Sequence, residues 1–308
     1  MSQTVAVPGP KVQMGVPIPN GKLGMWLFLG TEIMFFTAFI GTYIVLRMGS
    51  PGWPTDTSVT HIQVLLGGIN TFVLICSSVS VVLAHEAMVK RNYTNAVRMM
   101  GITLVLACVF LGIKMKEYHG KYVHDILPGH VAETDQQALD KMVRELDKVS
   151  GLPVLRGELN VVSNRERAES TPALKQQIEA LDAKIKDQSA KYGTAFTKLR
   201  EDAKAGRISL HEAETKLKTL QDKHVEFRNV HEPHPILYGN IFASTYFTMT
   251  GFHALHVILG MFFFLHIIYL GVKRKLGPQH NVLVENYGLY WHFVDLVWIF
   301  LFPLLYII

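Results

Sequence analysis

The sequence predicts an all-α protein, a polytopic transmembrane helix bundle with about five membrane-spanning helices and one soluble helical insert. Charged side chains make up 18% of the chain, whereas soluble proteins average roughly 25%. These charges are also unevenly distributed, because residues 133–230 contain 17 acidic and 18 basic side chains. One part of the chain is therefore expected in water and the rest in lipid.

Five stretches are long and apolar enough to cross a bilayer, whose hydrocarbon core of about 30 Å requires about 20 apolar residues in a helix. They cover residues 23–46, 62–83, 97–113, 238–272 and 284–308. Each is too long and too uniformly apolar for a strand. The predicted division is an N-terminal tail at 1–22, three spanning helices in 23–118, an extramembrane insert at 119–235 and two spanning helices in 236–308.

The first spanning segment carries one charge, Glu32, near its middle. An ionisable group at hydrocarbon depth costs at least about 2.5 kcal/mol on insertion scales, so it is a functional candidate by default. Glu32 is predicted either to take part in proton transfer or to act as a neutral acid that orders the bundle.

The insert contains two amphipathic patterns. Apolar residues recur at steps of three and four from Leu174 to Leu199, after a plausible helix start at Pro172. Gly206 interrupts the pattern, and Ser209 with Glu212 forms a capping-box signature before a second apolar stripe. The predicted structure is a helical hairpin or coiled-coil stalk, preceded by a helix near 134–149. It serves either as a solvated spacer or as a partner-docking module.

The fourth and fifth spanning segments contain further polar residues. His253 and His256 are three residues apart on one helix, and an interhelical hydrogen-bonding role is favoured over a metal site. Glu285, His292 and Asp295 form a polar stripe on the last helix that could meet the two histidines. We favour a helix-locking role for this cluster over a proton relay, since a buried polar network must satisfy its own members.

Orientation follows from the basic loops. Lys90, Arg91 and Arg98 lie between the second and third segments, and residues 273–275 between the fourth and fifth. Because cytoplasmic loops collect Lys and Arg, we expect a cytoplasmic N-terminus, with the insert and the C-terminus on the outer side.

Several chemistries have no signature in the sequence. There is no apparent haem–copper ligand set, phosphate-binding glycine loop or nucleophile elbow, and Cys76 and Cys108 lack metal or disulfide spacing. The net charge of +5 is not a nucleic-acid signal, because the excess base lies beside apolar runs. We expect no catalytic residue, metal ligand or cofactor on this chain, and no nucleic-acid partner.

The apolar segments resemble subunit III of the heme–copper oxidases, in its five-helix form. Five short motifs carry the resemblance: Trp26 with Thr31, Glu32, Phe35 and Phe36; the run from Asn70 to Ser78; Glu117 with Tyr118; the run from Tyr246 to Val257; and Glu285 with Tyr290 to Asp295. The insert is outside the resemblance, and so are the first two helices of seven-helix members.

The resemblance implies an accessory subunit of a respiratory terminal oxidase in the inner (plasma) membrane of a bacterium. Its partners would be oxidase subunits I and II, which carry the haem and copper, and membrane phospholipids. It implies that Glu32 is a reactive buried carboxylate supporting proton uptake, and that His253, His256, Glu285, His292 and Asp295 belong to an internal polar network. The predicted structural or lipid-facing residues are Trp26, Asn70, Glu117, Tyr290, Trp291 and Trp298.

Other interpretations of the sequence stay open. The subunit could serve a quinol oxidase or a nitric oxide reductase, which share much of the pattern, and the insert could contact cytochrome c or another respiratory complex. From other classes, a stand-alone haem-binding cytochrome would use His253, His256 and His292. A proton conductor would use Glu32 and the polar stripe, and a scaffold would use none of them chemically.

Overall fold

A computed structural model describes residues 19–55, 60 and 62–307, and within these ranges the chain forms helices joined by turns and loops, without strands. Of the predicted tail at 1–22, residues 1–18 lie outside the described residues. The all-α prediction is confirmed.

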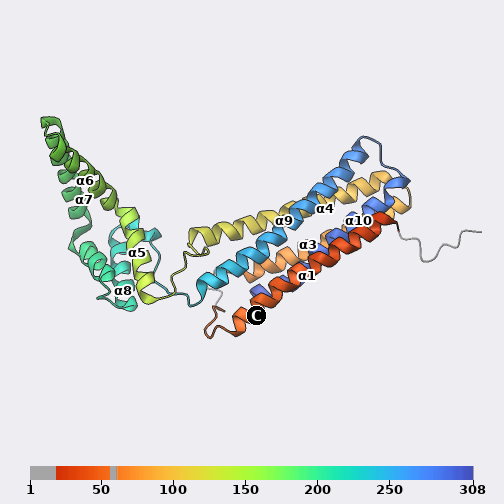
Figure 1. The fold of residues 1–308 in the computed structure, drawn as a ribbon, viewed down its shortest axis with the longest axis horizontal. Helices are drawn as coiled ribbons and strands as arrows, with labels where there is room; N and C mark the ends of the chain where they lie inside the picture. The colour runs from red at the N-terminus through yellow and green to blue at the C-terminus, as the bar shows by residue number, and fades with distance from the viewer. Residues whose placement is uncertain (1–18, 56–59, 61, 308) are drawn as a thin grey trace, which may run out of the picture. The chain divides into compact units, whose positions relative to one another are not determined.

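Among the described residues, five helices are long and apolar enough to cross a membrane (Figure 1). They are α1 (Asn20–Met48), α3 (Val64–Val89), α4 (Tyr93–Val123), α9 (Gly239–Val272) and α10 (Asn281–Tyr306). The predicted number of spans is confirmed, but α4 continues ten residues past its predicted end at residue 113. The 34 residues of α9 reach about 50 Å at about 1.5 Å per residue, so this helix exceeds the hydrocarbon thickness.

The last helix, α10, lies among the other spanning helices. In its apolar span 56% of the residues are buried, against 6% in α1. The Phe293 ring of α10 contacts the Phe36 ring of α1, and the Trp298 ring of α10 contacts the Phe110 ring of α4. Trp291 bonds to Ser77 of α3 and covers the backbone of Gly260 in α9. The aromatic side chains of α10 therefore form the centre of this packing, and α1 presents most of its apolar surface outward.

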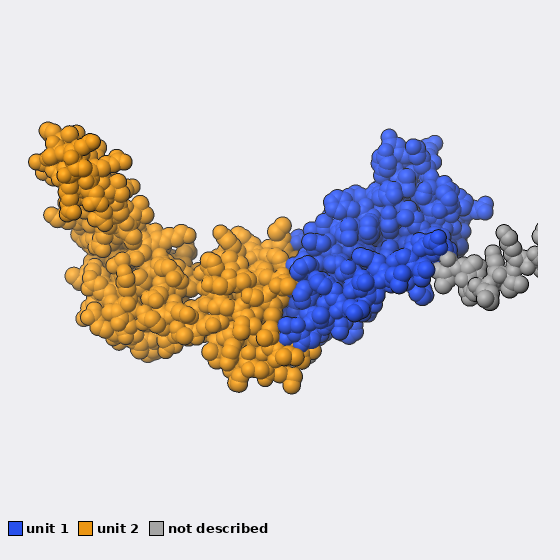
Figure 2. Space-filling model, in the orientation of Figure 1, with its two compact units in different colours: residues 1–42, 65–113, 249–307 blue, residues 43–64, 114–248, 308 orange. Residues whose placement is uncertain are grey.

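The chain forms two compact units (Figure 2). One comprises residues 1–42, 65–113 and 249–307, and the other residues 43–64, 114–248 and 308. These boundaries fall inside α1, α4 and α9, so they differ from the sequence-based division at 22, 118 and 235, which stays a prediction.

The insert contains four α-helices and a short 3₁₀ turn. The helices are α5 (Asp135–Ser150), α6 (Leu152–Ala168), α7 (Pro172–Lys204) and α8 (Leu210–Lys223), followed by η1 (Val225–Asn229). Thr134 and Gln137 form a full capping box on α5, and the Ser209 hydroxyl accepts from the Glu212 N–H at the start of α8. Gly206 adopts a left-handed conformation (φ 64°) in the turn between α7 and α8, as the sequence predicts.

The insert has its own apolar core. Side chains of α5, the second half of α7, α8 and η1 meet there, including Met142, Phe196, Leu217 and Phe227. The first half of α7 instead packs on α6, a helix that the sequence analysis does not predict. The two halves of α7 meet at Gly193, whose backbone is non-helical (φ 71°, ψ −179°). The predicted hairpin is thus extended by α6 and divided by a kink.

Candidate functional site

Glu32 of α1 and His256 of α9 form a side-chain pair. Their Oε2 and Nε2 atoms are 3.0 Å apart, and the two side chains are 20% and 10% exposed. The other ring nitrogen of His256, Nδ1, lies 2.8 Å from the Phe252 carbonyl oxygen. A carbonyl oxygen only accepts hydrogen bonds, so Nδ1 must carry a hydrogen.

The hydrogen on Nδ1 limits the ways in which His256 and Glu32 can form a hydrogen bond. With Nδ1 protonated, the bond between Nε2 and Glu32 needs one further proton, which belongs either to the carboxylic acid or to an imidazolium. Either arrangement is neutral overall, which suits a site of low polarity. A hydrogen bond of this geometry holds its proton on either partner with the same net charge, so the arrangement is suited to proton transfer.

Aromatic side chains pack around the His256 imidazole. The Phe36 ring lies 5.2 Å from the His256 ring between centroids, and the Tyr290 ring stacks at 6.4 Å. The Tyr290 hydroxyl donates to the His256 carbonyl oxygen at 2.9 Å and so joins α10 to α9 at this level. These contacts hold the imidazole in place.

A second polar region joins α3 to α10. Ser78 Oγ lies 2.6 Å from His292 Nδ1, and the indole N–H groups of Trp291 and Trp298 donate to Ser77 and Thr71. Asp295 is 5% exposed. Ser78 lies close enough to interact with the Asp295 carboxyl, but neither carboxyl oxygen has hydrogen-bond geometry with any described residue.

The remaining predicted polar residues lie elsewhere. His253 is 1% exposed, and its ring lies between Phe110 and Trp298 at centroid distances of 5.7 and 5.1 Å. Glu285 pairs with Lys22 at 2.6 Å, where both side chains are about one-third exposed. The structure therefore brings Glu32 to His256 and His292 to Ser78, and it pairs Glu285 with Lys22. Their assigned roles stay predictions.

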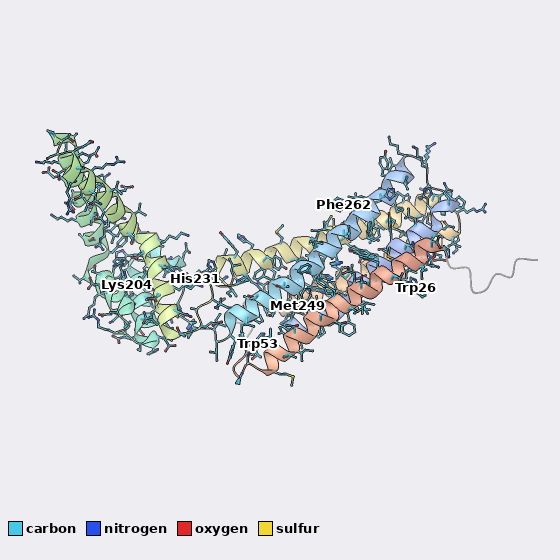
Figure 3. All side chains as sticks on the ribbon, in the orientation of Figure 1. Trp26, Trp53, Lys204, His231, Met249 and Phe262 are labelled. Carbon is cyan, nitrogen blue, oxygen red and sulfur yellow. The ribbon has the colours of Figure 1, made fainter. Side chains whose placement is uncertain are left out.

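The predicted structural residues divide into exposed and buried positions. Trp26 points away from its helix and is 62% exposed (Figure 3). The others are buried: Asn70, Glu117, Tyr290, Trp291 and Trp298.

Glu117 belongs to a buried ionic cluster that the sequence analysis missed. Its carboxylate accepts from Lys114 Nζ at 3.0 Å and from the Tyr246 hydroxyl at 2.6 Å. Lys121 is 1% exposed and donates to the Thr60 carbonyl oxygen at 2.9 Å. The signal was present in the sequence, because Lys114, Glu117 and Lys121 follow one helical face at steps of three and four.

No group of three or more His, Cys, Asp or Glu side chains is assembled as a metal site in residues 19–55, 60 and 62–307. His253, His256 and His292, the predicted ligands of the haem-cytochrome reading, each contact different partners, as described above.

Known proteins resemble the apolar segments. A family model described as cytochrome c oxidase subunit III matches residues 10–124 and 223–308. The cytochrome c oxidase subunit 3 of Alkalihalophilus pseudofirmus is 40% identical over 106 residues, covering 34% of this chain and 50% of the relative. The proteins of the same name from Thermostichus vulcanus and Marchantia polymorpha are 43% and 46% identical over 74 and 69 residues. Those two matches cover 22% and 21% of this chain, and 35% and 25% of the relatives.

The chain thus spans half or less of the length of these curated relatives. Residues 125–222, which include most of the insert, separate the two matched segments. The matched segments nevertheless make up more than half of the chain and contain all five apolar helices. The chain belongs to the cytochrome c oxidase subunit III family.

Proposed function

We propose that this chain is the accessory subunit III of a respiratory heme–copper terminal oxidase, and that its Glu32–His256 pair supports proton uptake by the complex. The observation that carries the proposal is the 3.0 Å contact between the Glu32 carboxyl and the His256 imidazole, two groups that can exchange a proton. In this proposal oxidase subunits I and II carry the haem and copper, and this chain contributes no redox centre. Phospholipids cover its exposed apolar surface.

The location proposed is the inner membrane of a bacterium, with a cytoplasmic N-terminus and an external insert and C-terminus. The basic residues Lys90, Arg91 and 273–275, which lie at the ends of α3 and α9, support it through the positive-inside rule. Accessibility of single cysteines placed at residues 91 and 166 to a membrane-impermeant thiol reagent in intact cells tests it. Labelling at 91 but not at 166 would show that the chain has the opposite orientation in the membrane.

Glu32→Gln in the assembled oxidase tests the proton role. The amide side chain can still hydrogen-bond His256, but it cannot hold or release the shared proton. We expect slower proton uptake and lower turnover at alkaline pH, where protons are scarce, with little change at acid pH. Glu86→Gln is the matched control, since this acid pairs with Lys90 near the end of α3, where both side chains are exposed. Equal proton uptake in wild type and both variants at alkaline pH contradicts the proton role and favours a scaffold.

Isolation of the complex in mild detergent tests the partners and the electron donor. A copurifying oxidase core chain supports the subunit proposal, and a subunit with a copper electron-entry site indicates cytochrome c as donor. A core chain without such a subunit indicates a quinol oxidase. The visible spectrum of this chain purified alone is expected to lack haem bands. Haem bands would favour the alternative hypothesis, that this chain is itself a haem-binding cytochrome.

We also propose that the insert is a docking element for cytochrome c or a second respiratory complex. It has a separate apolar core and carries interspersed charges on its surface, so it can fold as an added module outside the segments that match the family. Deletion of residues 134–228 is expected to alter cytochrome c kinetics or the partners that copurify. If assembly, cytochrome c kinetics and copurifying partners are all unchanged, the insert is a spacer rather than a docking element.

A further inference from the structure

A groove with a volume of about 210 Å³ lies on the insert between the second half of α7 and α8, two helices that contact each other (Figure 1). We call it the lysine groove. Within each helix the lining residues are three, four or seven positions apart, so each helix presents one face to the groove. The described lining residues are Ala195, Lys198 and Leu199 of α7, with Lys216, Thr219, Leu220 and Lys223 of α8.

The floor of the lysine groove is apolar and belongs to the core of the insert. Leu199 and Leu220 are 0% and 2% exposed, and both pack in that core. The rings of Phe196 and Phe227 stack in the same core, 5.4 Å apart between centroids. Because a close-packed core resists rearrangement, the groove is present before any ligand binds.

The rim of the lysine groove is basic. Lys198, Lys216 and Lys223 line it, and no acid is among the described lining residues. Lys216 is held by Glu212 at 2.8 Å and lies 4.0 Å from Asp202. Lys198 and Lys223 are exposed, and neither forms an ion pair with a described residue. Two ammonium groups are therefore available to a ligand.

This basic rim is a local property of the insert. Residues 133–230 contain 17 acidic and 18 basic side chains, so the insert as a whole is close to neutral. Other exposed lysines of α7 and α8 have acidic partners, as Lys191 has Glu226 at 2.7 Å and Lys218 has Glu214 at 2.6 Å. Unbalanced positive charge around an apolar floor complements an apolar side chain that is flanked by carboxylates.

The volume of the lysine groove limits what can enter it. Pockets for small molecules and cofactors usually measure about 300–1,000 Å³, and the groove is smaller. One large apolar side chain fits, and protein interfaces concentrate their binding energy on such anchors. An amphipathic helix that lies in a groove presents anchors of this kind along one face.

We propose that the lysine groove binds an acidic segment of a partner protein. One leucine or aromatic side chain of the segment enters between α7 and α8, and its carboxylates pair with Lys198 and Lys223. The inference rests on the docking role proposed above for the insert, and it adds the chemistry of the partner, whose contact surface is acidic. Charge pairs at the rim of an interface select the partner and speed its association, and salt screens them.

Binding of a labelled peptide to the full-length chain in an uncharged detergent tests the groove. The probe is a fluorescein-labelled amphipathic helix with leucines on one face and glutamates beside them, and its fluorescence anisotropy reports binding. We expect saturable binding that weakens in high salt. Lys198→Glu with Lys223→Glu should weaken it at least tenfold. Lys175→Glu with Lys184→Glu is the matched control, since these exposed lysines of α7 lie outside the groove.

Two further arms keep the test decisive. A peptide with lysines in place of the glutamates should bind the Lys198→Glu, Lys223→Glu variant more tightly than it binds wild type. Ala195→Phe fills the groove without a change of charge and should also weaken binding of the glutamate peptide, whereas Ala183→Phe, at an exposed position outside the groove, should not.

Four results would overturn the proposal. They are the absence of saturable binding, equal binding of a peptide with glutamines in place of the glutamates, and equal affinities of the groove variants and their controls. The fourth is a wild-type dimer in sedimentation that the Lys198→Glu, Lys223→Glu variant does not form, because the occupant of the groove would then be a second copy of the chain.

The same double variant in the assembled oxidase separates this proposal from the docking role of the insert. Where deletion of residues 134–228 alters cytochrome c kinetics or the copurifying partners, Lys198→Glu with Lys223→Glu should alter the same property. An unchanged property would place docking elsewhere on the insert and overturn the proposal for the groove. If the deletion alters nothing, the docking role fails, while the peptide titration still decides whether the groove binds acidic segments.

Discussion

Trp291 of α10 donates its indole N–H to the Ser77 hydroxyl of α3 over 2.9 Å, and both residues are fully buried. The same hydroxyl donates to the Leu74 carbonyl oxygen at 2.7 Å. One serine thus satisfies the only polar group of a large aromatic side chain and remains satisfied itself. Further along the same pair of helices, Trp298 donates to Thr71 in the same manner.

Ser77→Ala should therefore destabilise the protein by about 1–3 kcal/mol, because it leaves the buried Trp291 N–H without its acceptor. Thermal unfolding of the purified chain in detergent, followed by circular dichroism, measures the loss. Trp291→Phe supplies the other corner of a double-mutant cycle. The Ser77→Ala step should cost much less in the Trp291→Phe background, and equal costs in both backgrounds would contradict the role of this hydrogen bond.

The approach of α9 to α10 depends on a glycine. A Cβ atom at Gly260 would lie 2.7 Å from the Trp291 ring, and the ring is held by Ser77. Gly260→Ala should cost about 1–3 kcal/mol, the usual range for overpacking a filled core. Gly251→Ala in the same helix is the control, since a Cβ there meets nothing within 4 Å. The two unfolding midpoints should separate, and equal midpoints would show that the helices can move apart freely.

The sequence predicted the spanning helices well because their signal is local. A run of about 20 apolar residues in a bilayer must satisfy its backbone within a helix, whatever surrounds it. Which polar groups meet is a tertiary property. Residues three apart differ by about 60° around a helix axis, so His256 faces Glu32 while His253 packs between aromatic rings. The three-residue spacing of the two histidines predicted that they lie near one face of the helix, but it could not identify the side chains that each one contacts.

The insert shows the same limit. Its amphipathic stripes and caps predicted α7 and α8, yet α6 was missed because Pro153, Gly157 and Asn160 weaken its helical pattern. The Gly193 kink was missed because one glycine inside a long periodic stretch is compatible with an unbroken helix. Packing on two different partners, α6 and the core of the insert, distinguishes the two halves of α7.

A salt-bridged lysine of the insert should give a pH-dependent contribution to stability. Lys218 Nζ lies 2.6 Å from Glu214 Oε1 and 3.3 Å from Glu232 Oε1. The hydrogen bond to Glu214 raises the pKa of Lys218 above its ordinary 10.5 and lowers the pKa of Glu214 below its ordinary 4.5. The lowered carboxyl pKa stabilises the fold above pH 4.5 and this contribution is lost as the pH falls further. The raised lysine pKa stabilises it below pH 10.5, and that contribution is lost as the pH rises further.

Lys218→Gln should accordingly lower the unfolding midpoint slightly at neutral pH, and its difference from wild type should vanish once Glu214 is protonated. The effect should also shrink in high salt, because the pair is exposed to solvent. Lys223→Gln on the same helix is the control, as this lysine makes no ion pair with the described residues. A difference that persists unchanged into acid would show that Lys218 acts through packing rather than charge.

The buried cluster at the end of α4 should be sensitive to the loss of a single charge. Glu117 is 4% exposed and accepts from Lys114 and Tyr246, while the ammonium of Lys121 lies 4.4 Å from the centre of the Tyr246 ring. Glu117 thus accepts two hydrogen bonds in a buried site that also contains the Lys121 side chain. Glu117→Gln removes the negative charge but keeps the shape, and breaking a buried ion pair in this way costs about 3–5 kcal/mol. The paired replacement Lys114→Met with Glu117→Gln removes both charges and should recover part of the loss. Detergent unfolding midpoints of the three proteins test this. A single variant as stable as wild type would mean that Lys114 is not held by the Glu117 charge.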